Sequence, residues 1–285
     1  MIQGTDNIGF SAKGWDTGVF RRFRFKPSKT IRYIKSEVIL PVGPNNARQS
    51  WVLSNTGTKL QQKGHPYIYI GCTRDVDVDA GFMYGETYND WAPFMWLKMN
   101  GLPQGQPYTG PRLQGGSSFV SLELLSVRKG KRLDQNGNVI LVNNQPKIVD
   151  VTPVSCRYEG FVKNTGAPWS HTYVYEMEDS VGKLSRADTI LKRVTGLGMD
   201  KPIKENDLGL IRRVRWQMTG IGYRKPDGSM FIRPINTTDI KELSNVAQTS
   251  SGPWSFPAIF RRMMNAQNPY EGEDVSLIND SQESP

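Results

Sequence analysis

The stretch LIRRVRWQMTGIGYRKPDGSMFIRPI, residues 210–235, decides the fold class of this chain. Two sets of residues alternate in its first half, the mainly apolar set Val214, Trp216 and Met218 and the polar set Arg213, Arg215, Gln217 and Thr219. Such alternation predicts a strand with one face in the core and the other in water. Pro226-Asp227-Gly228 then predicts a tight turn, and the apolar residues 230–232 predict the returning strand. The stretch therefore predicts an antiparallel β-hairpin.

The same period-two alternation recurs from residue 31 to residue 235, and turn signals such as Asn-Gly-Asn at 136–138 and Asn-Thr-Gly at 164–166 interrupt it. This pattern predicts an all-β protein, an antiparallel two-sheet jelly-roll sandwich. Short C-terminal helices are expected at two places. Asp239 and Glu242 have the spacing of a helical capping box, and residues 257–264 carry apolar side chains at helical spacing.

The length of 285 residues fits one sandwich domain with extensions at both ends. We expect a basic N-terminal arm at residues 1–27 and the β-sandwich domain at residues 28–236. Residues 237–285 are expected to form the short helices and an acidic C-terminal tail. Aromatic residues make up 10% of the chain, which provides the bulky side chains that a folded core needs.

The charge of the chain is unevenly distributed. The formal net charge is +9, yet residues 268–285 hold five acidic residues and no Lys or Arg, so residues 1–267 have a net charge of +14. A basic body of this kind attracts anionic partners. We therefore expect a glycan or another anionic polymer as partner, or self-association in which the acidic tail of one copy meets the basic residues 21–26 of the next. Plain solubility is the alternative reading of the charge.

Cysteine content and hydropathy leave the cellular location of the protein open. Cys72 and Cys156 are the two cysteines, so at most one intrachain disulfide can form, and we favour two buried free thiols. No run of about 18 apolar residues is present, which predicts no transmembrane helix and no membrane partner. The N-terminal residues lack the pattern of a signal peptide. We expect cytoplasmic synthesis, followed by non-classical release or by incorporation into a particle.

Residues 71–100, GCTRDVDVDAGFMYGETYNDWAPFMWLKMN, contain Val78-Asp79-Ala80-Gly81-Phe82 followed by Trp91-Ala92-Pro93-Phe94. This combination resembles a motif of the YrpD-type family of uncharacterised bacterial proteins. The resemblance implies a sandwich of the concanavalin-like, lectin-like kind. It implies no activity, because that family has none that is settled.

The same motif contains the candidate ligand site. Tyr84, Tyr88 and Trp91 supply aromatic rings that can stack on the apolar faces of sugars, and their neighbours Asp79, Asn89 and Asp90 can accept hydrogen bonds from sugar hydroxyls. These six residues predict a non-catalytic binding module whose ligand is carbohydrate. The alternative for Trp91 is a place in the core. The alternative function, from a different class, is a structural subunit of a virion, phage tail or similar self-assembling particle.

Signs of enzymatic chemistry are weak. His65 and His171 do not have the spacing of metal ligands, and the sequence contains no nucleophile elbow and no phosphate-binding loop. Glu176 and Glu178 could form the carboxylate pair of a glycanase, which is a minor alternative to an exposed acidic strand end. We expect no cofactor. Calcium is a weak alternative, which requires Asp75, Asp77 and Asp79 to lie in a loop rather than a strand.

A nucleic-acid partner is also not favoured. The basic and aromatic residues at 21–26 have the composition of a surface that binds phosphates and stacks on bases, but no known nucleic-acid-binding motif accompanies them.

Overall fold

The structure is a computed structural model of the chain. It describes residues 3–9, 16–25, 31–41, 51–54, 65–73, 76–85, 90–99, 108–126, 128–132, 138–178, 190–198, 209–235, 240–248, 255–262 and 271–277. All regular elements in these ranges are β-strands, and every pair of neighbouring strands is antiparallel. The prediction of an all-β, antiparallel fold is therefore confirmed.

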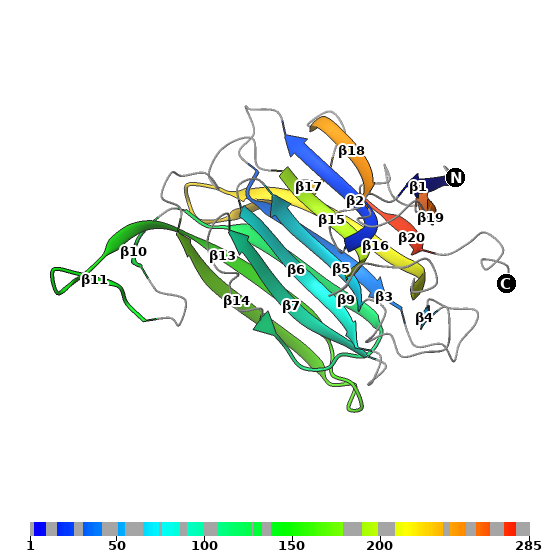
Figure 1. The fold of residues 1–285 in the computed structure, drawn as a ribbon, viewed down its shortest axis with the longest axis horizontal. Coiled ribbons are helices and arrows are strands. Elements are labelled where there is room, and N and C mark those ends of the chain that lie inside the picture. Colours follow the sequence, from blue (N-terminus) through cyan, green and yellow to red (C-terminus); the bar gives the residue numbers. More distant parts are fainter. Residues whose placement is uncertain are drawn as a thin grey trace.

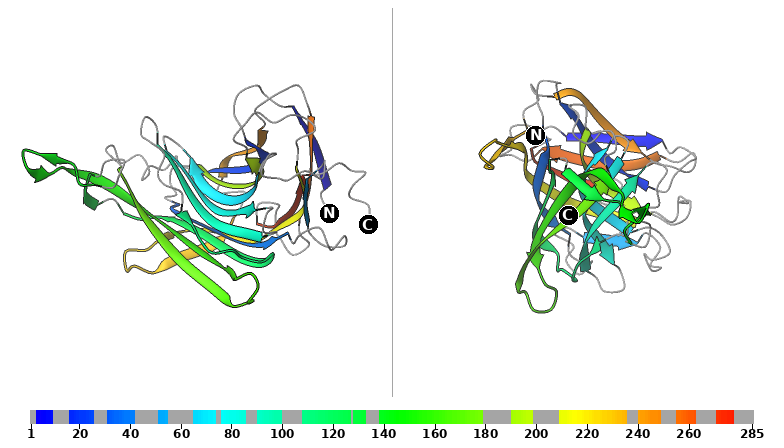
Figure 2. Two further views of the ribbon diagram at one scale, coloured as in Figure 1. Left: turned by 60° about the horizontal axis from the view of Figure 1, so that its bottom comes forward. Right: turned by 90° about the vertical axis from the view of Figure 1, so that its left-hand side faces the viewer.

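Two large sheets lie one over the other as curved layers (Figures 1 and 2). The main path of the eleven-stranded sheet is β1 (Gln3–Gly9), β19 (Ser255–Arg262), β20 (Glu273–Leu277), β16 (Gly209–Arg224), β3 (Tyr33–Leu40), β9 (Gly116–Leu124), β13 (Ile148–Phe161) and β10 (Arg128–Lys131). Its branches are β14 (Pro168–Glu178) on β13, and β17 (Met230–Pro234) and β4 (Trp51–Ser54) on β16.

The seven-stranded sheet has the order β18 (Ile240–Gln248), β2 (Asp16–Phe25), β15 (Ile190–Gly198), β5 (His65–Thr73), β6 (Val76–Gly85), β7 (Asp90–Met99) and β8 (Tyr108–Thr109). A separate ribbon of β11 (Leu141–Val142) and β12 (Gln145–Pro146) projects from the sandwich, at the far left of Figure 1.

One hydrophobic core lies between the two large sheets. Ile34 and Val38 of β3 reach it from the eleven-stranded sheet, and Ile68 and Ile70 of β5 reach it from the seven-stranded sheet; all four are fully buried. On β3, buried and half-buried residues alternate along the whole strand, as the period-two pattern predicts. Each fully buried aliphatic side chain contributes about 1.5–3 kcal/mol to the free energy of folding.

The hairpin predicted for residues 210–235 is confirmed, because β16 pairs with β17 from Gly220–Pro234 to Arg224–Met230. Its turn is closed by a hydrogen bond from Lys225 N to Ser229 O of 2.8 Å, and Gly228 adopts a φ of 82° there. That left-handed conformation has little steric cost for glycine.

The predicted alternation in β16 is wrong after Gln217. A β-bulge there places Met218 and Thr219 together opposite Ser36 of β3. Met218 has a φ of 51° and is 59% exposed, whereas Thr219 is fully buried. The extra residue therefore exchanges the two faces of the strand, and the predicted core residue Met218 lies in solvent.

The short C-terminal helices are not confirmed, because the two segments form β18 and β19. β18 pairs with β2, and β19 pairs with β1 and β20, so hydrogen bonds to distant strands take the place of local helical ones. The segment expected to form an N-terminal arm contributes β1 to one sheet and β2 to the other. The predicted domain boundaries at residues 27 and 236 stay predictions. Strands from before and after each boundary pair within the same sheets.

Cys72 and Cys156 are buried free thiols, as expected. Burial raises the pKa of Cys156, and a smaller contribution comes from its hydrogen bond to Tyr158, which acts in the opposite direction. Within the ranges that the structure describes, no helix is long and apolar enough to cross a membrane.

Candidate functional site

The structure buries three of the six residues predicted to bind a ligand. Trp91 is fully buried at the start of β7, and its indole Nε1 donates a hydrogen bond of 2.7 Å to the carbonyl oxygen of Pro41. Tyr84 is 3% exposed and packs against Trp91 with 5.1 Å between ring centroids. The alternative that Trp91 lies in the core is therefore correct, and neither ring is available for stacking on a ligand.

Asp90, also predicted to bind the ligand, is 1% exposed and forms ion pairs with Arg112 Nη1 at 3.1 Å and Lys163 Nζ at 3.3 Å. Its carboxylate therefore holds two loop segments against β7 instead of facing a ligand. Asp79 is half-buried on β6. Tyr88 and Asn89 lie outside the described residues.

The strongest candidate surface lies elsewhere, on β14. Four ring side chains occupy alternate positions of this strand and so share one face: Trp169, His171, Tyr173 and Tyr175, which together we call the β14 aromatic stripe. Their register partners on β13 are Gly160, Tyr158, Cys156 and Val154, all of them buried, so the stripe lies on the inner face of the eleven-stranded sheet.

The rings of the stripe are only partly covered. Trp169, Tyr173 and Tyr175 are half-buried against the hydrophobic core, and His171 is exposed. The Trp169 and His171 rings are stacked, with 6.1 Å between centroids and 20° between planes. Among the described strands, β14 is the outermost one beyond β13, at the lower left border of the molecule in Figure 1. Successive rings are therefore about 7 Å apart along the rim of the sandwich.

The chemistry of the stripe suits a ligand with flat apolar faces and hydroxyl groups. Aromatic faces stack on apolar surface, and the tyrosine hydroxyls and the imidazole exchange hydrogen bonds with polar groups. Burial raises the pKa of Tyr175, and the nearby Tyr173 raises it further. The Tyr175 hydroxyl therefore keeps its proton at neutral pH and can donate a hydrogen bond. The aromatic alternation is visible in the sequence. The sequence does not show that this strand lies at the edge of its sheet among the strands that the structure describes.

The predicted metal and catalytic acids gain no support from geometry. Asp77 and Asp79 lie on strand β6, so the strand alternative to a calcium loop holds for them, and Asp75 lies outside the described residues. Among the described residues, no group of three or more His, Cys, Asp or Glu side chains could hold a metal ion. Glu176 and Glu178 are on β14, but their side chains lie outside the part of the chain that is described.

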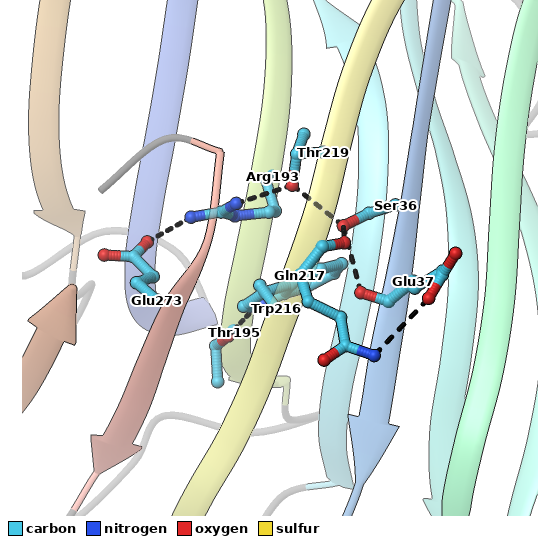
Figure 3. A network of polar contacts seen from close by, with 8 residues as sticks. All are labelled: Ser36, Glu37, Arg193, Thr195, Trp216, Gln217, Thr219 and Glu273. Carbon is cyan, nitrogen blue, oxygen red and sulfur yellow. Dashed lines mark hydrogen bonds and ion pairs between the residues drawn. The ribbon is translucent and has the colours of Figure 1, made fainter. Parts of the chain in front are cut away.

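A second polar cluster is buried between the sheets (Figure 3). Arg193 of β15 forms an ion pair with Glu273 of β20 and donates a hydrogen bond of 2.7 Å to Thr219 Oγ1. Thr219 in turn shares a hydrogen bond of 2.8 Å with Ser36, and Trp216 Nε1 donates one of 2.8 Å to Thr195. Because these groups are at most 1% exposed, the cluster links the sheets and is closed to a ligand.

Two acidic residues of the tail segment have partners within the chain, while the predicted contact between acidic tail and basic arm of two copies stays a prediction. Glu273 is used by Arg193 within the chain, and Asp274 accepts hydrogen bonds of 2.8 and 3.1 Å from Arg215. Residues 21–25 lie within β2, which has strand neighbours on both sides, β18 and β15. Glu273 and Asp274 are therefore paired within the chain, and for residues 21–25 the structure describes the backbone pairing of β2 alone.

Comparison with known proteins gives limited similarity. No family model matches this chain. The uncharacterized protein YrpD of Bacillus subtilis (strain 168) is 38% identical over 58 residues, which are 20% of this chain and 23% of YrpD. The match therefore spans about a quarter of the length of that relative. It supports, in part, the resemblance to YrpD-type proteins, and it carries no information about a lectin-like sandwich.

Among solved structures, two of scytalido-glutamic peptidase with transition-state analogues have TM-scores of 0.44 and 0.45, with 8% and 7% sequence identity. One of SCP-B, a member of the eqolisin family of peptidases, in complex with the tripeptide Ala-Ile-His has a TM-score of 0.44 and 8% identity. Each alignment covers 94% of this chain and 100% of the other. Similarity at this level carries no conclusion about this chain.

Proposed function

We propose that this protein is a non-catalytic binding module whose ligand is carbohydrate, and that the ligand binds at the β14 aromatic stripe. The observation that carries the proposal is the row of four ring side chains on one face of an outermost strand, of which His171 is exposed and the others are half-buried. The proposal keeps the ligand class predicted from the sequence and replaces the residues that bind it.

The chemistry of the stripe favours a sugar over a purely apolar ligand. A sugar ring presents C–H groups on its faces and hydroxyls at its edge, and the stripe offers ring faces together with two tyrosine hydroxyls and an imidazole. A partly exposed row along a strand also suits an extended chain of sugar units, because the rings repeat at a regular spacing. The proposal includes the finer expectation of a jelly roll of the concanavalin-like, lectin-like kind.

Substitution of the stripe tests this function. Trp169→Ala and Tyr173→Ala each remove one ring, and we expect each to weaken glycan binding about tenfold, which corresponds to about 1.4 kcal/mol. The wild-type protein is first screened on a glycan array, and affinities for the best ligand are then measured by calorimetry. Tyr223→Ala is the matched control, because Tyr223 is a 39% exposed aromatic residue on another strand.

Two outcomes contradict the proposal. The first is a wild-type protein that binds no glycan on the array. The second is that Trp169→Ala and Tyr173→Ala bind glycan with the same affinity as the control Tyr223→Ala.

A second candidate function is the structural subunit of a self-assembling particle. The observation that favours it is the outer edge of β14 at residues 168–175, which contain no Asp, Glu, Lys or Arg and are suited to contact with another copy of the chain.

A further inference from the structure

The outer edge of β14 is a long, regular strand edge. Among the strands that the structure describes, β14 pairs only with β13, through eleven consecutive register pairs from Val151–Glu178 to Phe161–Pro168. No bulge interrupts this pairing. An edge strand of this length directs a row of backbone N–H and C=O groups outward, where they can pair with a further strand.

The greater part of this edge lacks the usual protection against such pairing, since its acidic residues, Glu176 and Glu178, lie at the C-terminal end of the strand. Edge strands of soluble proteins are commonly guarded by charged residues, by bulges or by short length. Residues 168–175, PWSHTYVY, contain no Asp, Glu, Lys or Arg, although the chain has 36 basic residues. The face opposite the aromatic stripe is also exposed there, with Val174 at 50%.

We propose that β14 pairs with β14 of a second copy of this chain, antiparallel and around a two-fold axis perpendicular to the sheet. Self-pairing of one strand is isologous, so it closes at the dimer and does not continue into a fibre. A register centred on Thr172 places Thr172 opposite its own copy and Val174 opposite Ser170. Pairs of β-branched and hydroxyl side chains are favourable across strands, and no like charges meet within residues 168–175.

Pairing of this geometry also extends the proposed ligand surface. A two-fold axis perpendicular to a sheet leaves the same face of both copies on the same side. The stripes of the two copies would therefore join into one aromatic surface, with His171 of each copy opposite Tyr173 of the other. This consequence rests on the proposed function, whereas the pairing of the edges does not.

Added charge on the edge tests the pairing. We expect the wild-type protein to be a dimer by analytical ultracentrifugation and by light scattering at micromolar concentration. Thr172→Lys places two like charges directly opposite each other at the two-fold axis, and Val174→Lys places a lysine opposite Ser170 on each side of the axis, where charge guards an edge strand against pairing. Both variants are therefore expected to be monomers. Val142→Lys is the control, because Val142 is 52% exposed on the projecting ribbon and adds the same charge away from the edge.

The outcomes separate the two proposals. A monomeric wild-type protein, or a dimer that persists in both β14 variants, overturns the pairing. Circular dichroism of all three variants establishes that a loss of the dimer is not a loss of folding. If Val174→Lys is a monomer with unchanged glycan affinity, the binding function is supported without the dimer. If Val174→Lys is a monomer with a weaker glycan affinity, the joined surface is supported. If the wild type is a dimer that binds no glycan, and both β14 variants are folded monomers, the proposed function is contradicted and the pairing is supported.

Discussion

Arg193 of the seven-stranded sheet and Glu273 of the eleven-stranded sheet form an ion pair in which each side chain is only 1% exposed. The two residues are 80 positions apart in the sequence. The Arg193 guanidinium also lies over the Trp216 ring, with 5.3 Å from its central carbon to the ring centroid, and donates to Thr219. The pair therefore connects the two layers at the point where β16 has its bulge (Figure 3).

Removal of one partner of this pair is expected to destabilise the protein strongly. Glu273→Ala leaves a buried guanidinium without its counter-charge, which costs about 3–5 kcal/mol. Urea unfolding monitored by tryptophan fluorescence measures the change in the free energy of unfolding. Asp274→Ala is the control, since its partner Arg215 is 41% exposed, and it should cost no more than about 1 kcal/mol. Equal losses in the two variants would show that the buried pair has no special role.

Trp91 is expected to act on stability and not on ligand binding. Trp91→Ala removes a fully buried ring and its hydrogen bond to Pro41, so the free energy of unfolding should fall by about 3–5 kcal/mol. The glycan affinity of the fraction that remains folded should stay at the wild-type value. A stable Trp91→Ala variant that has lost glycan binding would return the ligand site to the segment at 71–100.

Gly81 is required by close approach of neighbouring backbone. A Cβ atom at this position would lie 2.1 Å from the Ile68 carbonyl oxygen and 2.5 Å from Tyr69 Cα, both of them backbone atoms of the adjacent strand β5. Gly81→Ala should therefore cost at least about 2–3 kcal/mol in thermal or urea unfolding. Gly160→Ala is the matched comparison, because its Cβ would first meet the side-chain atom Leu113 Cδ1 at 3.0 Å. A smaller loss is expected there, and the reverse order would contradict this explanation.

Cys156 is expected to be unreactive in the folded protein. Burial raises its pKa, so the thiol stays neutral at pH 8, and the thiolate is the form that reacts with alkylating reagents. Because the folded state holds the proton more tightly than the unfolded chain, this group stabilises the fold at low pH. That stabilisation is lost as the pH rises above about 8.5, the pKa of an unfolded cysteine. Mass spectrometry should show alkylation at pH 8 only after addition of urea, and rapid labelling of the native protein would contradict burial.

The sequence by itself determined the all-β class and the hairpin at residues 210–235. The hairpin at residues 210–235 is predicted correctly because its signals are local: alternation over neighbouring residues and a Pro-Asp-Gly turn that closes within a few positions. The same local signals predicted an all-β protein, and the general tendency of cysteine to be buried predicted the two buried thiols.

Only the tertiary structure decided which aromatic residues face solvent. Trp91 and Trp169 both occupy strands with alternating side chains, but Trp91 lies on β7 within the core and Trp169 lies on the outermost strand β14. The position of a strand within a sheet depends on hydrogen bonds between segments far apart in the sequence, and nothing in the local pattern encodes it. For the same reason the segment of β18 pairs with β2 in spite of its helical capping signal, and the bulge beside Met218 turns Thr219 toward Ser36 and Arg193.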